Sequence, residues 1–213
     1  MKIDIVADTI CPWCYIGKVR LDRALEMRPQ SNLTVGWRAF QLNPDMPSAG
    51  IDRRDYVREK FGGPDRAKAV YGSLSRAGSE EGIEFNFQII ETTPNTIHSH
   101  RLVRHAATYE LQTPVVTAIY EAYFQKGQNI GDIEILADIG ESVGIDRSKT
   151  LQFLESDADT ETVVAEDELA RKLGVTGVPC FIVNRKYAVS GAQSAEVLVQ
   201  VFDLANQDEI AKQ

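Results

Sequence analysis

The pattern of apolar and polar positions at the start of the chain predicts a strand, a helix and a second strand. The run "KIDIVA" (2–7) predicts a short buried strand, and "LTVGWRAFQL" (33–42) alternates apolar and polar positions as a second strand does. Between them, apolar residues recur at helical spacing from Pro12 to about Arg28, and proline is favoured at the first position of a helix. The first forty residues therefore predict a βαβ unit.

The far end of the chain predicts a second small α/β segment. A helix at about 160–173 leads into a short apolar strand, "CFIVN" (180–184). The run "YAVSG" (187–191) follows after a tight turn and is a plausible antiparallel partner of that strand. A closing helix is expected at 194–207, where Ser194 is a good N-cap.

The middle of the chain is predicted to be helical. Helices are expected at about 52–61, 65–81, 96–110, 114–126, 132–143 and 147–156, separated by stretches rich in Pro, Gly and Asn. We therefore expect a discontinuous α/β domain made of residues 1–45 and 158–213, interrupted by a helical insertion domain at 46–157.

Composition narrows the classes of function. A chain of 213 residues, 43% of them hydrophobic, can bury the core of one domain with a large insertion. The net charge of −8, without a basic block, argues against nucleic acid as a partner. No long apolar run predicts a membrane span, and the strand-like N-terminus does not resemble a signal peptide. We expect a cytoplasmic protein.

The chemistry is suggested by the cysteines. The chain has three, and two of them, Cys11 and Cys14, form a C-x-x-C in "DTICPWCYIG" (8–17). In a reducing cytosol such a pair is more often catalytic or metal-binding than a permanent structural disulfide. A zinc site would need four ligands, drawn also from Cys180 and the histidines of "IHSHRLVRH" (97–105). Those histidines are better explained as surface or helix-packing residues, so we expect no metal.

The position of the pair predicts unequal roles for the two cysteines. Cys11 precedes the first helical residue, where unpaired N–H groups and the helix dipole favour a thiolate. Cys14 lies one turn further on, on the buried face of the helix. Cys11 is therefore expected to attack a disulfide and Cys14 to resolve the mixed disulfide. Trp13 is expected at the rim, and Asp8 either takes up protons or opposes thiolate formation.

A second motif supports a family resemblance. The run "GVTGVPCF" (174–181) places Val178 and Pro179 between a predicted helix and strand. Together with "DTICPWCYIG", it resembles the thioredoxin superfamily, in particular the DsbA-like cytosolic group that includes FrnE-type proteins. The runs "NTIHSHRL" (95–102) and "SGAQ" (190–193) extend the resemblance over essentially the whole chain.

The resemblance implies a thioredoxin-like fold interrupted by a large all-helical insertion that forms a lid over the cysteines. It also implies that Pro179 is cis and faces the C-x-x-C. The backbone of Val178 would then be free to pair with a substrate chain as an added strand. With Pro12 and Trp13, these two residues form the expected substrate-binding set.

The leading prediction is a thiol–disulfide oxidoreductase that acts on protein or small-molecule disulfides and thiols. It would need no metal or organic cofactor, although glutathione is a candidate co-substrate. One alternative is a glutathione-dependent isomerase or transferase of the hydroxychromene-carboxylate isomerase or kappa type. Such proteins usually carry Ser or a single Cys where this chain has Cys11 and Cys14. A second alternative to the oxidoreductase is a redox-linked, chaperone-like binding module.

Cys180 departs from the family pattern, in which Thr, Ser or an aromatic residue commonly follows the proline. It is either a third redox thiol or, as we favour, a buried thiol packed as a small hydrophobe.

Overall fold

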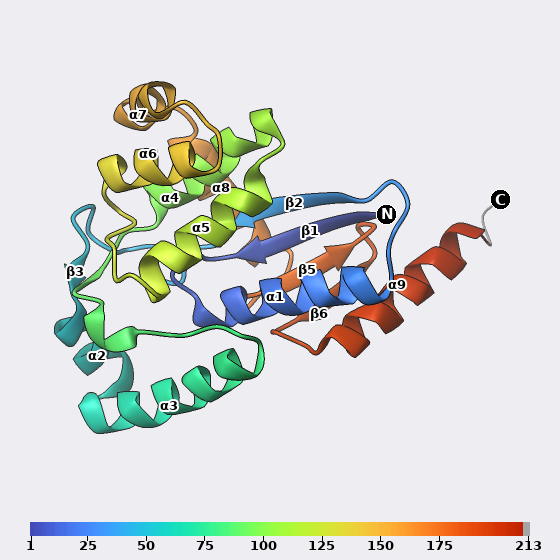
Figure 1. Cartoon of the computed structure of the whole chain (residues 1–213), viewed down its shortest axis with the longest axis horizontal. Helices are drawn as coiled ribbons and strands as arrows, with labels where there is room; N and C mark the ends of the chain where they lie inside the picture. The colour runs from blue at the N-terminus through green and yellow to red at the C-terminus, as the bar shows by residue number, and fades with distance from the viewer. Residues whose placement is uncertain (211–213) are drawn as a thin grey trace.

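In residues 1–210, which the computed structural model describes, a four-stranded sheet is built from segments near the two ends of the chain. Its strands are β1 (Lys2–Ala7), β2 (Thr34–Ala39), β5 (Cys180–Val183) and β6 (Tyr187–Ser190). They lie in the order β2-β1-β5-β6, as Figure 1 shows. β1 runs parallel to β2, whereas β5 is antiparallel to both β1 and β6. The predicted βαβ unit and the C-terminal hairpin are both confirmed.

The central strand fixes where the site lies. β1 is buried along nearly its whole length, as expected for a strand flanked on both sides by other strands, and Ile5 pairs with Trp37 on one side and Phe181 on the other. Because β1 and β2 are parallel, their carboxyl ends meet at the same edge of the sheet. The segments that follow them, starting at Asp8 and Phe40, are therefore neighbours.

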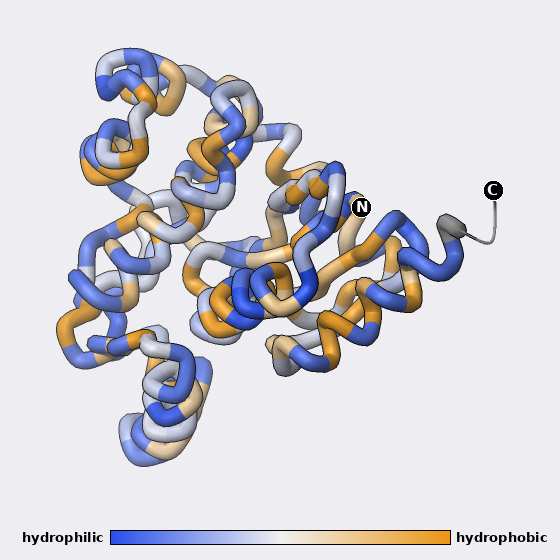
Figure 2. Tube along the Cα trace, turned by 45° about the vertical axis from the view of Figure 1, so that its right-hand side comes forward, coloured by the Kyte–Doolittle hydropathy of each residue, from blue (hydrophilic) through white to orange (hydrophobic). Residues whose placement is uncertain are grey.

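Two helices pack together alongside the sheet. They are α1 (Pro12–Met27) and α9 (Ala195–Ile210), and they lie side by side in Figure 1. Figure 2 shows apolar positions recurring between hydrophilic ones along the C-terminal helix. That spacing gives the helix one apolar side, and Leu198, Phe202 and Ala205 on it are fully buried.

The middle of the chain is helical apart from one short pair of strands. Its helices are α2 (Arg53–Phe61), α3 (Pro64–Glu80), α4 (Ile97–Ala106), α5 (Gln112–Phe124), α6 (Ile133–Ser142) and α7 (Arg147–Glu155), with two 3-10 turns, η1 (Phe87–Ile89) and η2 (Ala107–Tyr109). The strands β3 (Ile51–Asp52) and β4 (Thr92–Thr93) pair antiparallel. The last helix before β5, α8 (Thr160–Lys172), packs on both β2 and α4. Among residues 1–210, no helix combines the length and apolarity needed to cross a membrane.

One predicted helix is divided in the structure. The stretch expected as a helix at 96–110 is α4 followed by the 3-10 turn η2. The chain then turns at Glu110, whose φ of 61° is left-handed, and the Leu111 N–H returns to the carbonyl of Ala106 at 2.9 Å. Such a turn ends a helix without a glycine, so no glycine marks the boundary in the sequence.

A buried arginine joins α4 to the end of α7. Arg101 is 1% exposed, and its guanidinium donates hydrogen bonds to four main-chain carbonyls. These acceptors are Phe153, Leu154, Ser156 and Ala158. The last carbonyls of a helix have no partner within the helix, so this side chain caps α7 from a neighbouring element.

Candidate active site

The two cysteines of the C-x-x-C lie at the corner between β1 and α1, as predicted. Cys11 is the N-cap of α1 and has an extended backbone, and Pro12 is the first helical residue. The Cys11 N–H donates to the carbonyl of Asp8 at 3.1 Å, which closes the turn after β1. The N–H groups of Cys14 and Tyr15 in turn donate to the Cys11 carbonyl, at 3.0 and 3.3 Å.

Both cysteines are more enclosed than the sequence suggests. The exposed fraction is 4% for Cys11 and 1% for Cys14, so Cys11 keeps the larger exposed fraction by a small margin. Trp13, between them in sequence, is 42% exposed and stands at the rim. All three cysteines are free thiols in the structure.

The electrostatic surroundings distinguish Cys14. Burial raises the pKa of the Cys14 thiol well above its ordinary value, and a hydrogen bond and charge interaction with Cys11 raise it further. The charge of Asp8 acts in the same direction, whereas a hydrogen bond from the Asp8 backbone lowers the pKa of Cys14. Cys14 therefore holds its proton firmly in the dithiol state.

The loop before β5 faces Cys11. The Val178–Pro179 peptide bond is cis, as the family resemblance implies. Cys11 Sγ lies 3.7 Å from the carbonyl oxygen of Val178. Gly17 of α1 allows the proline ring to approach, because a Cβ at Gly17 would lie 2.8 Å from Pro179 Cγ. The structure thus brings Cys11, Val178 and Pro179 together.

Cys180 is not part of this group. It packs with Val6, Phe40 and Ala170 in a small cluster, whereas Cys11, Cys14 and Phe181 belong to the main core. Consecutive residues of a strand point to opposite faces, which accounts for the separation of Cys180 from its neighbour Phe181. Burial raises the pKa of the Cys180 thiol. Its role as a third redox thiol stays a prediction.

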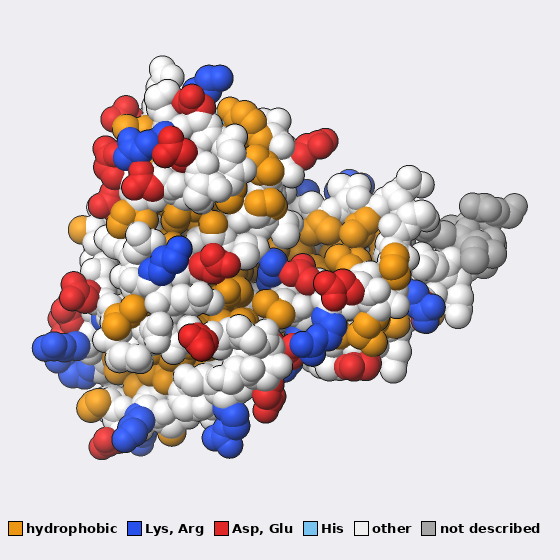
Figure 3. All heavy atoms as spheres, viewed as in Figure 1, with side chains coloured by type: hydrophobic (Ala, Val, Ile, Leu, Met, Phe, Trp, Pro, Cys, Tyr) orange, Lys and Arg blue, Asp and Glu red, His pale blue; other side chains and the backbone are white. Residues whose placement is uncertain are grey.

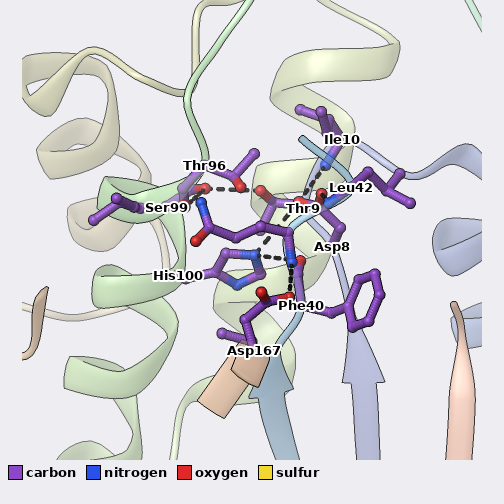
Figure 4. Close-up of polar contacts among 12 residues, drawn as sticks. Asp8, Thr9, Ile10, Phe40, Leu42, Thr96, Ser99, His100 and Asp167 are labelled. Carbon is purple, nitrogen blue, oxygen red and sulfur yellow. Dashed lines mark hydrogen bonds and ion pairs between the residues drawn. The ribbon is translucent and has the colours of Figure 1, made fainter. Parts of the chain in front are cut away.

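A buried acid and histidine adjoin the cysteines, and Figure 4 shows them. Asp8 is fully buried, and its carboxylate accepts hydrogen bonds from the N–H groups of Leu42, at 2.7 Å, and Ile10, at 3.5 Å. His100 Nε2 lies 3.4 Å from Asp8 Oδ1 and 3.1 Å from the Phe40 carbonyl oxygen. Burying a carboxylate is costly unless donors surround it, and these groups supply them.

Two hydroxyls extend the contact between the turn that follows β1 and α4. Thr9 Oγ1 and Ser99 Oγ are 2.7 Å apart, and the Ser99 hydroxyl also donates to the Thr96 carbonyl. The sequence analysis interpreted the histidines as surface or helix-packing residues and missed the pairing of His100 with Asp8. Thr96, Ser99 and His100 recur at the spacing of one helix face, which indicates a shared polar face but not the partner that lies opposite it.

Tyr120 of α5 is a second group that the sequence analysis missed. It is 1% exposed, and its hydroxyl lies 3.4 Å from the Asp8 carbonyl oxygen. Burial, followed by the charges of Cys14, Cys11 and Asp8, raises the pKa of Tyr120 well above its ordinary value. The phenol is therefore protonated, and able to donate a hydrogen bond, at neutral pH.

The three histidines are dispersed rather than gathered as a metal site. His98 Nδ1 lies 2.9 Å from Arg101 Nη1, His105 stacks on Phe153, and His100 faces Asp8. Within residues 1–210, no three or more His, Cys, Asp or Glu side chains are grouped to hold a metal ion.

An open groove lies on the Asp8 side of the site, and neither cysteine lines it. It has a volume of about 660 Å³ and lies between residues 42–47 and α2. Leu42, at one end of it, is the residue whose N–H binds the carboxylate of Asp8. Figure 3 shows acidic and basic side chains interspersed with apolar ones on one face of the molecule.

Solved structures share this arrangement of elements. A probable DsbA oxidoreductase, SCO1869 from Streptomyces coelicolor, matches with a TM-score of 0.88 and 30% identity, over 96% of this chain and 89% of its own. A 2-hydroxychromene-2-carboxylate isomerase matches with a TM-score of 0.74 and 19% identity over 100% of both chains. The cytosolic disulfide reductase DsbM from Pseudomonas aeruginosa, solved with GSH, matches with a TM-score of 0.66 and 16% identity, over 99% and 98%. At such identities the last two show the fold alone.

The comparison with protein families covers nearly the whole chain. The family model described as the DSBA-like thioredoxin domain matches residues 2–203. This range includes the C-x-x-C, the helical middle and the cis proline. The chain therefore belongs to the DSBA-like thioredoxin domain family.

Proposed function

We propose that this protein is a thiol–disulfide oxidoreductase in which Cys11 is the nucleophile and Cys14 is the resolving thiol. DsbA-like family members are thiol–disulfide oxidoreductases that act on thiol or disulfide substrates. The observation that carries the proposal for this chain is the unequal setting of two adjacent free thiols. Cys11 is the N-cap residue of α1, with its Sγ 3.7 Å from the Val178 carbonyl oxygen, whereas Cys14 lies on the first turn of the helix, where burial raises the pKa of its thiol.

The reaction balances without a metal or an organic cofactor. The Cys11 thiolate attacks one sulfur of a substrate disulfide, the S–S bond breaks, and the departing thiolate takes up a proton. Cys14, as a thiolate, then attacks Cys11 Sγ and releases the second substrate thiol. The substrate disulfide has gained two electrons, and Cys11 and Cys14 have lost two as they form a disulfide. A thiol such as glutathione reverses these steps and restores the dithiol.

The substrate is proposed to lie between the cis proline and the rim of the site. A chain that pairs with the backbone of Val178 brings its sulfur next to Cys11, whose Sγ is already 3.7 Å from the Val178 oxygen. Trp13, half exposed beside Pro12, offers an apolar surface to it. The open groove at residues 42–47 is wide enough, at about 660 Å³, for the flanking residues of a peptide or for glutathione.

The isomerase alternative rests on a shared fold with the 2-hydroxychromene-2-carboxylate isomerase, at 19% identity. Chemistry of that type needs no second thiol next to the first, and this chain has Cys14 on the first turn of the helix that Cys11 precedes, where the two thiols interact electrostatically. The pair therefore favours disulfide exchange. A redox-linked, chaperone-like module is the remaining alternative, and it would not depend on the sulfur atoms.

The test is the reduction of insulin by dithiothreitol, followed by the turbidity of the released B chain. The wild-type protein is expected to accelerate precipitation, and Cys11→Ser to remove the acceleration. Cys14→Ser, which retains the nucleophile, is expected to accumulate a mixed disulfide with glutathione that mass spectrometry detects. Equal rates with wild type, Cys11→Ser and buffer would contradict the proposal. Suppression of aggregation that survives in the Cys11→Ser/Cys14→Ser protein would instead support the chaperone-like module.

A further inference from the structure

We propose that Asp167 and Arg171 are positioning residues for substrate binding: as an ion pair on α8, they hold the start of the open groove against the helix that leads to the cis proline. The role rests on the proposed function, in which a substrate chain lies between Pro179 and the groove. Neither side chain is expected to touch the substrate. Each acts through the main chain of Gln41, which directly precedes the first groove residue, Leu42.

The main chain that follows β2 is held by side chains rather than by another strand. β2 lies at an edge of the sheet and ends at Ala39. Beyond that end, the Gln41 N–H donates to Asp167 Oδ1 at 2.8 Å, and the Gln41 carbonyl accepts from Arg171 Nη2 at 2.6 Å. Figure 4 shows the Asp167 carboxylate turned toward this segment. The ion pair thus binds the two groups through which a neighbouring strand would pair.

Asp167 and Arg171 also bind one another. Arg171 Nε lies 2.9 Å from Asp167 Oδ2, and Arg171 Nη2 lies 3.0 Å from Asp167 Oδ1, a two-point contact that fixes both side chains. The Asp167 side chain is 7% exposed, and Arg171 Cζ lies 4.4 Å from the centre of the Phe40 ring. Because a planar guanidinium makes all these contacts at once, lysine cannot reproduce them.

The segment that the ion pair holds also packs on the cis-proline loop. Phe40 and Ala170 of α8 belong to one small apolar cluster, and Leu42 and Val178 pack against it. The carbonyl oxygen of Val178 lies 3.7 Å from Cys11 Sγ. A shift of the segment would therefore move the start of the groove and the Val178 backbone relative to one another and to the sulfur.

The next acid–base pair along α8 provides a matched control. The run "DELARK" (167–172) contains two such pairs at the same spacing, and only the fold distinguishes them. Glu168 and Lys172 lie 3.4 Å apart, but their side chains are 59% and 74% exposed. An exposed ion pair of this kind contributes little to stability, so removing it tests the effect of charge on α8 without the contact to Gln41.

The test compares two disulfides of 2-mercaptoethanol. One joins it to the central cysteine of a short synthetic peptide, and the other is 2-hydroxyethyl disulfide, which has no chain to lie in the groove. Reduced protein is mixed with a range of concentrations of each, quenched with acid at intervals, and analysed by mass spectrometry for the Cys11–Cys14 disulfide. The half-saturating concentration and the limiting rate are obtained separately.

Arg171→Lys and Asp167→Asn are the test variants. Lysine keeps the positive charge but cannot bind Asp167 and the Gln41 carbonyl together, and asparagine keeps one acceptor for the Gln41 N–H but loses the charge. In each variant, the half-saturating concentration of the peptide disulfide is expected to rise about tenfold, as loss of a hydrogen bond to a charged group predicts, with the limiting rate changed less than about threefold. The ratio of the second-order rate constants for the two disulfides is expected to fall by the same factor.

The control variants are Glu168→Gln and Lys172→Gln. Both are expected to leave the half-saturating concentration and the limiting rate within about twofold of wild type. Circular dichroism and urea unfolding of each variant establish that it is folded under the assay conditions. If one of the two test variants does not fold, the other carries the test.

A higher half-saturating concentration of the peptide disulfide in the test variants, with the control variants unchanged, supports the proposal. Equal slowing with both disulfides, an unchanged half-saturating concentration, or the same effect in the control variants overturns it while leaving the proposed function intact. Failure of the wild-type protein to form the Cys11–Cys14 disulfide with either substrate would instead overturn the proposed function.

Discussion

Gly17 is the point at which α1 and the cis proline touch, and its replacement by alanine tests the geometry of the site. A Cβ at this position would lie 2.8 Å from Pro179 Cγ and 3.2 Å from Phe181 Cζ. Both neighbours are held: the proline by its ring and by the hydrogen bond from the Gly191 N–H to its carbonyl, at 2.8 Å, and Phe181 by complete burial. The added methyl group must therefore displace the loop that carries Pro179.

Two opposing effects determine how much Gly17→Ala changes the free energy of unfolding. Alanine is intrinsically better than glycine inside a helix by about 1 kcal/mol. Forcing a methyl group into a packed site costs about 1–3 kcal/mol, and a contact at 2.8 Å to a rigid ring belongs at the upper end. We expect Gly17→Ala to lower the free energy of unfolding by about 1–2 kcal/mol. It should also lower kcat/KM for insulin reduction, because the Val178 carbonyl moves away from Cys11.

The assay is urea unfolding followed by circular dichroism, together with the insulin assay. Gly72→Ala is the control, since Gly72 lies inside α3 and a Cβ there would have no neighbour within 4 Å. This variant is expected to gain up to about 1 kcal/mol of stability and to keep full activity. The reasoning is refuted if Gly17→Ala matches Gly72→Ala in stability and the wild type in activity.

Three further predictions use buried groups elsewhere. Arg101→Met removes the donor of hydrogen bonds to four main-chain carbonyls. It should lower the free energy of unfolding, measured in urea, by about 3 kcal/mol or more. Burial lowers the pKa of His98 and of His105, so the unfolded chain binds more protons below about pH 6.5. Stability should therefore fall as the pH drops through that range, and less steeply in His98→Gln. Burial raises the pKa of Cys180, so mass spectrometry should find it alkylated more slowly than Cys11 and unlinked in oxidised protein; a disulfide to Cys180 would identify it as a third redox thiol.

Some element boundaries could be predicted from the sequence because local capping interactions fix them. The helix expected at 132–143 is observed as Ile133–Ser142, and its start is set by Asp132, whose side chain accepts from the Glu134 N–H. Asp146 caps α7 in the same way through Lys149. Such caps depend on residues two or three positions apart, which a sequence displays directly.

Long-range pairings could not be predicted in this way. The β3–β4 pair joins Ile51 to Thr93, and two residues in each strand are too few to show a period in the sequence. The contact of Asp8 with His100 was missed for a related reason. Whether a polar residue on a helix faces water or a buried partner depends on what the fold places opposite it, and no local rule states that.

The site therefore depends on both parts of the chain. The segment around β1 and α1 supplies the sulfur atoms, whereas His100, Ser99 and Tyr120, which contact Asp8 and Thr9, come from the predicted insertion. Removing this segment would take the histidine from the Asp8 carboxylate and expose that carboxylate to water. A protein reduced to the sheet, α1 and α9 should therefore change the electrostatic environment of Cys14, on which the charge of Asp8 acts. Residues of the helical middle thus line the buried side of the site around Asp8.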